Sequence, residues 1–377
     1  MVAPGGAPAL MMDLRTRLPG LDLEARLEAD REVLVLFGPS GSGKTTILNI
    51  IAGLVRADAG EIALEGQVVF RRGVPGAGRD LPARARHIGY VMQQYALFPH
   101  MTALENVAYP MGRAPDRLDR AARLLDLLAM GSHAGHRPAQ LSGGQQQRIA
   151  LARALAAERS ILLLDEPFAA LDAGLRDRLQ ADLRRLRAEL DLTVLLVTHR
   201  LEDAFAIGDR LAVVRKGRIE QVGPVGDVFR RPATRGVAEI MGIRNLITAR
   251  VASADGTALT LEWDGLRLEM PHVPDVRANQ DVTAYIRPED VKIVYPDRPL
   301  SDAVAHNVFD ARVTSHHESA AMRVLSVQLE NGRELEVRFP ALSYRPIRLE
   351  PGDTVRVALR REGLLLLHST DTGAGST

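Results

Sequence analysis

The 377-residue sequence contains no cysteine, which excludes disulfide bonds, thiolate metal sites and cysteine nucleophiles. It contains no apolar run that approaches the roughly 18 residues needed for a membrane-spanning helix. If the protein acts at a membrane, we therefore expect it to do so from outside the bilayer. Only three of the 48 basic residues are lysines, and the formal net charge is +1. Overall charge therefore gives no argument for nucleic acid as a partner. No aromatic residue precedes Phe37.

The composition that remains is typical of a globular protein, with 46% hydrophobic and 25% charged residues. The length exceeds that of one typical core and predicts two or three domains. The first ten residues are rich in proline and glycine and carry no basic segment. We expect them to form a loose tail rather than a signal peptide.

A predicted strand, a glycine-rich turn and a predicted helix follow one another near the start of the chain. The strand is the apolar run Val33–Phe37, and the turn reads Gly38, Pro39, Ser40, Gly41, Ser42, Gly43, Lys44, Thr45 and Thr46. Glycines let successive N–H groups point inward, and a helix N-terminus favours negative charge. Lys44 is placed to reach the β- and γ-phosphates, and the Thr45 hydroxyl to ligate Mg²⁺. The pattern predicts a site for a nucleoside triphosphate with Mg²⁺.

Two carboxylates, Asp165 and Glu166, follow a fully apolar predicted strand. Charge at that position is costly unless it meets a metal or a polarised water. We expect Asp165 to hold Mg²⁺ through water, and Glu166 to act as the base that orients or deprotonates the attacking water. The alternative is an aspartate that only caps the next turn.

Gln93 and His199 each follow another predicted strand. The Gln93 amide oxygen can ligate Mg²⁺ or contact the attacking water, although the adjacent Gln94 leaves the assignment open by one residue. His199 can contact the γ-phosphate and hold the transition-state geometry. A surface glutamine and a structural histidine are the alternatives.

A second candidate phosphate site precedes the predicted helix near residue 149. Ser142, Gly143, Gly144 and Gln145 place another helix N-terminus there. One chain cannot easily direct two helix N-termini at a single γ-phosphate, whereas a symmetric dimer can supply the second in trans. We therefore expect a homodimer.

These motifs, together with Leu141 and the triplet Ala170-Leu171-Asp172, resemble in order and spacing the ATP-binding subunit of ABC transporters. The resemblance covers about residues 12–240. It implies that two nucleotide domains sandwich two ATP molecules, each between the Lys44 loop of one and the Ser142 signature of the other. It also implies that Asp172 couples the two sites across the interface.

The resemblance further implies two transmembrane permease subunits, contacted through residues 95–101, and a periplasmic or extracytoplasmic solute-binding protein. It places the chain at the cytoplasmic face of the inner (cell) membrane as a peripheral subunit, with no nucleic acid partner. We expect an α/β P-loop NTPase domain with a helical subdomain over residues 12–242. Short predicted strands separated by turns indicate an all-β domain of small barrels over residues 243–370. This part resembles the regulatory domain that follows the ATPase domain in many bacterial importer ATPases.

The motifs say least about which solute is transported. The aromatic-free beginning and Phe37 directly before the turn resemble molybdate importer ATPases, so molybdate or tungstate is expected. Sulfate, ferric iron, polyamines and sugars are the alternatives, and an exporter or a soluble ABC ATPase acting on nucleic acid or ribosomes is also considered. The C-terminal part partly resembles the small oxyanion-binding repeat of molybdate systems. The alternative is a purely structural or regulatory barrel that binds no oxyanion. His316 and His317 are expected to lie in a loop as a solvated pair.

Overall fold

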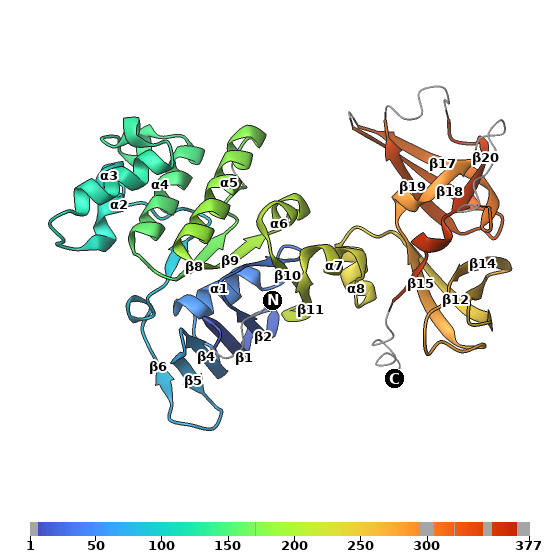
Figure 1. The fold of residues 1–377 in the computed structure, drawn as a ribbon, viewed down its shortest axis with the longest axis horizontal. Helices are drawn as coiled ribbons and strands as arrows, with labels where there is room; N and C mark the ends of the chain where they lie inside the picture. Colours follow the sequence, from blue (N-terminus) through green and yellow to red (C-terminus); the bar gives the residue numbers. More distant parts are fainter. Residues whose placement is uncertain (1–6, 170, 295–304, 320, 342–348, 368–377) are drawn as a thin grey trace. The chain divides into compact units, whose positions relative to one another are not determined.

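The computed structural model describes residues 7–169, 171–294, 305–319, 321–341 and 349–367. The chain divides into two compact units, residues 1–230 and 231–377 (Figure 1). This division falls before helix α8 (Arg235–Ile240), whereas the division expected at residue 242 falls after it. Within the described ranges, no helix is both long enough and apolar enough to cross a membrane.

The first unit is built on one 11-stranded sheet with the order β6-β5-β4-β1-β2-β11-β10-β3-β9-β8-β7. Its strands are β1 Leu10–Leu18, β2 Leu21–Ala29, β3 Val33–Phe37, β4 Ala59–Leu64, β5 Gln67–Arg72, β6 Arg79–Asp80, β7 Gly89–Val91, β8 Ile161–Asp165, β9 Thr193–Thr198, β10 Arg210–Arg215 and β11 Arg218–Pro224. The part containing β10, β3, β9, β8 and β7 is parallel, and the β1, β2, β4, β5 and β6 part is antiparallel.

Burial explains the two kinds of strand. Every residue of β3, β8 and β9 is buried, as expected for central strands of a sheet covered on both faces. In β1, buried Leu10, Met12 and Leu14 alternate with more exposed residues, so this strand presents one apolar face. Strands β1 and β2 pair antiparallel, and so do β4 and β5, so this part of the sheet is built from two hairpins.

Seven helices are described in this unit. They are α1 Lys44–Ala52, α2 Ala103–Ala108, α3 Arg117–Leu127, α4 Gly143–Ala156, α5 Ala173–Leu190, α6 Leu201–Ile207 and α7 Val225–Arg230. Helix α1 packs against β8 and β9, whereas α2, α3 and α4 contact one another and form a group of their own (Figure 1). This group is the predicted helical subdomain. Short 3₁₀ turns also occur, at Ala83–Ala85, Tyr109–Met111, Gly131–His133 and Pro138–Gln140.

The second unit contains α8 and two five-stranded antiparallel sheets, with the orders β14-β13-β12-β15-β21 and β16-β20-β17-β18-β19. Their strands are β12 Asn245–Ala254, β13 Ala258–Trp263, β14 Leu266–Pro271, β15 Asp281–Ile286, β16 Val291–Val294, β17 Val308–Glu318, β18 Met322–Leu329, β19 Glu334–Pro340, β20 Thr354–Leu359 and β21 Leu365–Leu366. One continuous apolar core joins the two sheets. The predicted order of an α/β domain and an all-β domain is confirmed.

The glycine-rich residues 71–82 include the end of β5 and the short strand β6, where Arg71 pairs with Arg79 at the sheet edge. One local prediction was wrong. His316 and His317 lie within β17 rather than in a loop, and they pair with Leu325 and Val324 of β18. Nδ1 of His316 lies 3.7 Å from a carboxylate oxygen of Glu350.

Candidate functional site

The glycine-rich turn joins β3 to α1, as predicted, and its geometry requires glycine at position 38. A Cβ at Gly38 would lie 2.0 Å from the carbonyl oxygen of Val214 in β10. Gly43, with φ of 106°, is the N-cap of α1, and a Cβ there would lie 3.1 Å from the Leu23 side chain. The turn is therefore held against the neighbouring strand ends. The first-turn N–H groups of α1 have no partners within the helix, so they form an anion-binding terminus.

Lys44 lies along the turn. Its Nζ donates hydrogen bonds to the carbonyl oxygens of Gly38 (2.9 Å) and Pro39 (2.8 Å), and the side chain is 6% exposed. Burial lowers the pKa of Lys44, and the nearby carboxylates of Glu166 and Asp165 act in the opposite direction. A buried ammonium group beside a helix N-terminus is suited to a multiply charged phosphate chain.

Thr45 and Asp165 are brought together from α1 and β8. Thr45 Oγ1 donates a hydrogen bond to Asp165 Oδ1 over 3.1 Å. Burial raises the pKa of Asp165, the Thr45 hydrogen bond lowers it, and the neighbouring Glu166 raises it again. A hydroxyl and a carboxylate at this separation are hard oxygen donors of the kind that Mg²⁺ prefers.

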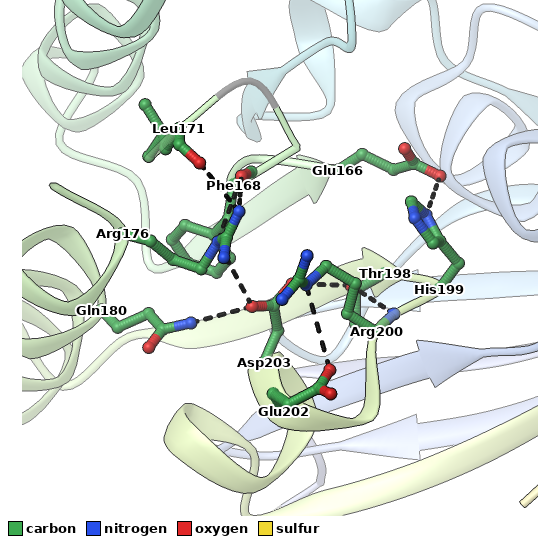
Figure 2. Close-up of polar contacts among 10 residues, drawn as sticks. All are labelled: Glu166, Phe168, Leu171, Arg176, Gln180, Thr198, His199, Arg200, Glu202 and Asp203. Carbon is green, nitrogen blue, oxygen red and sulfur yellow. Dashed lines mark hydrogen bonds and ion pairs between the residues drawn. The ribbon is translucent and has the colours of Figure 1, made fainter. Parts of the chain in front are cut away.

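Glu166 and His199 also meet. Nδ1 of His199 lies 3.1 Å from Oε1 of Glu166 (Figure 2). The Glu166 N–H donates to the carbonyl oxygen of Val197. Glu166 has φ of 49°, an uncommon left-handed conformation for a residue with a side chain. That conformation ends β8 abruptly and turns the carboxylate toward His199.

Sheet register explains why these residues converge. In the parallel pairs, Phe37 lies opposite Thr198 and Asp165 lies opposite Val197. The turn after β3, Glu166 after β8 and His199 after β9 therefore leave the sheet at one edge. This is the edge at which ligands bind in open α/β sheets.

Gln93 lies in a turn, two residues after the end of β7, and is exposed. Parallel pairing of Val91 with Leu164 directs this segment to the same sheet edge as Asp165. The segment that follows is fastened to the helical group, because Arg153 of α4 donates to the carbonyl oxygens of Tyr95 and Ala96, both over 2.8 Å. The structure thus places Gln93 at the same sheet edge as the Thr45–Asp165 pair, and no hydrogen bond joins Gln93 to that pair among the described residues.

The second predicted phosphate site is the N-terminus of α4. Ser142 is the N-cap, with its Oγ accepting from the Gln145 N–H (3.4 Å) and its own N–H donating to the Gln145 side chain (2.8 Å). Ser142 and Gly143 are exposed, whereas Gly144 is buried against Leu171 and Leu175. The exposed part of this terminus is open to a ligand or a second protomer.

Asp172 is the N-cap of α5, and its carboxylate accepts from the Leu175 N–H over 2.9 Å. Its neighbour in the predicted triplet, Ala170, lies outside the described residues. Because Gly144 packs against Leu171, the Asp172 turn and the start of α4 are neighbours within one chain.

The sequence interpretation missed a buried polar cluster beneath this edge. Asp203 of α6 is 2% exposed and accepts hydrogen bonds from Thr198 and Gln180, each over 2.9 Å (Figure 2). A usable signal was present, since Asp203 shares the buried face of a short helix with Ala204 and Ile207. A charged residue on an apolar helix face is a functional or structural exception that requires partners.

Comparison with known proteins identifies the family. Residues 23–169 match the ABC transporter model, and residues 284–367 match the TOBE domain. The chain is 42% identical over 339 residues to the sulfate/thiosulfate import ATP-binding protein CysA 2 of Chromobacterium violaceum, covering 87% of this chain and 86% of that protein. The chain belongs to the ABC transporter ATPase family.

Further similarities fit this ABC transporter ATPase. It is 38% identical over 349 residues to the spermidine/putrescine import ATP-binding protein PotA of Roseobacter denitrificans, covering 91% of each chain. Among solved structures, the ATP-binding cassette MJ0796, a dimer in a post-hydrolysis state bound to ADP and Pi, is 32% identical with a TM-score of 0.50. That similarity covers 57% of this chain and 98% of the cassette.

The expected family, fold class and ATPase activity are confirmed, and the chain is an ATP-binding protein. The expected link to molybdate is not supported, because the relatives described above are named for sulfate/thiosulfate and for spermidine/putrescine. The names favour the alternatives of sulfate and polyamine. The absence of an upstream aromatic residue was therefore a poor guide to the solute.

Proposed function

We propose that this chain is the ATP-hydrolysing subunit of an ABC import system. The observation that carries the proposal is the convergence of Lys44, Asp165, Glu166 and His199 at one sheet edge. The import proteins to which the chain is similar over most of its length support the direction of transport.

In this proposal the turn Gly38–Thr46 and Lys44 bind the phosphates of ATP. Glu166 orients a water and accepts its proton as the water attacks the γ-phosphorus. The bond from the γ-phosphorus to the β,γ-bridging oxygen breaks, and ADP and phosphate leave. His199, held by Glu166 at 3.1 Å, contacts the γ-phosphate and fixes that geometry. Thr45, Asp165 and Gln93 would hold Mg²⁺, which supplies neutralising charge at the phosphates.

The functional assembly in this proposal is a homodimer. Ser142, Gly143, Gly144 and Gln145 of one protomer complete the ATP site of the other, and Asp172 couples the two sites. Two observations support it: the N-terminus of α4 is exposed, and the similar cassette MJ0796 is described as dimeric. ATP binding closes the dimer, and hydrolysis allows it to reopen.

We place the permease contact on the segment after Gln93. Phe98 packs against Tyr109 with ring centroids 4.6 Å apart, and Tyr109 is 56% exposed. The buried Asn106 holds the segment by accepting from the Phe98 N–H over 2.8 Å. This preformed, partly apolar surface fits a helix of a transmembrane subunit at the cytoplasmic face of the membrane. A solute-binding protein completes the system.

Sulfate or thiosulfate is the first candidate solute, and spermidine or putrescine is the second, each supported by a relative similar over most of the chain. Uptake of radiolabelled sulfate and spermidine by cells that carry this chain, compared with cells carrying Glu166→Gln, tests the proposal. If the cells with Glu166→Gln lose uptake of only one of the two solutes, that solute is the one transported. Unchanged uptake of both would contradict both assignments.

A further inference from the structure

The polar cluster beneath the ATP site connects three segments that the proposed mechanism uses separately. At its centre is Asp203, with Oδ2 accepting from Thr198 Oγ1 and Oδ1 from Gln180 Nε2 (Figure 2). Nε of Arg176 lies 3.9 Å from Oδ1 of Asp203. Arg200 lies at the edge of the cluster, with Nε 4.0 Å from Oδ2.

Arg176 reaches from the first turn of α5 to the segment between Glu166 and Asp172. Its Nη2 donates to the carbonyl oxygen of Leu171 over 2.8 Å, and its Nε lies 3.4 Å from the carbonyl oxygen of Phe168 (Figure 2). The guanidinium group therefore fixes both ends of the turn that precedes Asp172. A planar fork of donors is suited to holding several acceptors in one arrangement.

On its other side the cluster flanks His199. The Thr198 hydroxyl donates to Asp203 and also accepts from the Arg200 N–H over 3.1 Å. Both chain neighbours of His199 are thus tied to one hydroxyl, and the His199 ring contacts Glu166. The contacts link His199, Asp203, Arg176 and the Asp172 turn within a single unit of the chain.

Stability alone is a weak reason for this arrangement. Burial raises the pKa of Asp203, which shows that the charged carboxylate is costly there, while hydrogen bonding to Thr198 lowers the pKa. Apolar residues of similar volume often stabilise a core as well as a buried ion pair or better. The cluster instead specifies one geometry for the segments that it joins.

We propose that Arg176 and Asp203 are positioning residues for ATP hydrolysis. They hold His199 and the Asp172 turn as one body, so that the γ-phosphate end of the site and the proposed dimer face change position together. This inference rests on the proposed function, because it assigns the pair a role in that hydrolysis.

A double-mutant cycle in the full-length chain tests the inference, using Arg176→Met, Asp203→Asn and the double variant. We expect each single change to lower kcat per folded molecule by about tenfold or more, because the two residues act through one contact network. We expect the Kd for ATP, measured by calorimetry, to stay within about twofold, because among the described residues neither makes a hydrogen bond or ion pair with the phosphate loop. The double variant should be no slower than the slower single variant.

Arg187→Met is the matched control. Arg187 lies on the same helix, and its Nη2 pairs with Asp209 over 3.0 Å, so the same change removes an ion pair away from the cluster. Its kcat should stay within about twofold of that of the unmodified chain. If Asp203→Asn does not fold, Thr198→Val replaces it in the cycle, because that change removes only the hydroxyl between His199 and Asp203.

Three results would overturn the inference: single variants with unchanged kcat per folded molecule, effects that multiply in the double variant, or an equal loss in Arg187→Met. A purely structural role would lower the thermal midpoint and leave kcat per folded molecule unchanged. An unmodified chain that binds no ATP or does not hydrolyse it would overturn the proposed function, and the inference with it, before any variant is compared.

Discussion

His199 and Glu166 are joined across the ends of neighbouring strands, with 3.1 Å between Nδ1 and Oε1. The histidine follows β9, and the glutamate follows β8 in a left-handed conformation. The contact fixes the direction of both side chains at the edge where the phosphate loop ends. It places the proposed base and the proposed γ-phosphate contact side by side.

This contact predicts that His199→Ala lowers kcat for ATP hydrolysis by about 100-fold, with little change in the Kd for ATP. In the proposed mechanism the histidine acts where the γ-phosphate reacts, whereas the loop and Lys44 provide the binding. His317→Ala in β17 is the control and should leave kcat unchanged. A His199→Ala chain that keeps half of the original kcat would remove His199 from the mechanism.

The absence of cysteine makes the proposed dimer directly testable, since any thiol must be an introduced one. Ser40 and Ser142 are both exposed. In a Glu166→Gln background, chains with Ser40→Cys mixed with chains with Ser142→Cys should form heterodimers with a short bismaleimide when ATP and Mg²⁺ are added. The yield is measured by denaturing electrophoresis of differently tagged chains.

Glu189→Cys replaces Ser142→Cys in the control mixture. Glu189 lies near the C-terminus of α5, which leads to the start of β9, at the sheet edge opposite His199. ATP should not increase cross-linking in that mixture. Equal cross-linking of both mixtures, or of the test mixture with and without ATP, would contradict the shared site.

Two glycines of the phosphate loop should respond differently to alanine. Gly38→Ala should abolish ATP binding and lower the thermal midpoint, because a Cβ there would lie 2.0 Å from the Val214 carbonyl oxygen. Gly41 has φ of 77°, and no neighbouring atom of the described residues lies within 4 Å of the position that a Cβ would take. Gly41→Ala should cost only about 1 kcal/mol in unfolding free energy. If Gly38→Ala and Gly41→Ala changed the thermal midpoint and the calorimetric ATP affinity equally, the close approach of Gly38 to the Val214 carbonyl oxygen would be contradicted.

Replacing two adjacent glutamines of α4 by methionine should change the unfolding free energy in opposite directions. The buried Gln147 has no hydrogen-bond partner for Nε2 or Oε1 among the described residues, so Gln147→Met should raise the unfolding free energy by about 1 kcal/mol. Gln146 Nε2 donates to the carbonyl oxygens of Pro138 and Leu141, so Gln146→Met should lower it by about 1 kcal/mol. Urea unfolding measures both. A change of the same sign in the unfolding free energy of both variants would contradict the conclusion that Gln146 is hydrogen-bonded and Gln147 is not.

The positions of Lys44, Asp165 and Glu166 could be predicted because each motif depends on local order: an apolar strand followed by a turn. Convergence at one edge then follows from parallel pairing, which alternating strands and helices already indicate. The Ser142 capping interaction was likewise accessible, because a serine three residues before a glutamine is a helix-start pattern.

Other features depend on contacts between distant segments. Arg176 and Asp203 belong to different helices, and their relation to Leu171 and Thr198 appears only after folding. The placement of His317 in a strand depends on pairing with β18, which compensates for a polar local sequence. Local patterns carry no information about such partners.

In the proposed mechanism Glu166 is the base for ATP hydrolysis, and ATP binding does not depend on its carboxylate. The most direct measurement compares ATP hydrolysis and ATP binding of the unmodified chain with those of Glu166→Gln. We expect the variant to lose at least about 100-fold in kcat, to bind ATP as tightly as before and to accumulate as an ATP-bound dimer in sedimentation. Hydrolysis retained in Glu166→Gln, with the unmodified chain active beside it, would contradict the assignment of Glu166 as the base.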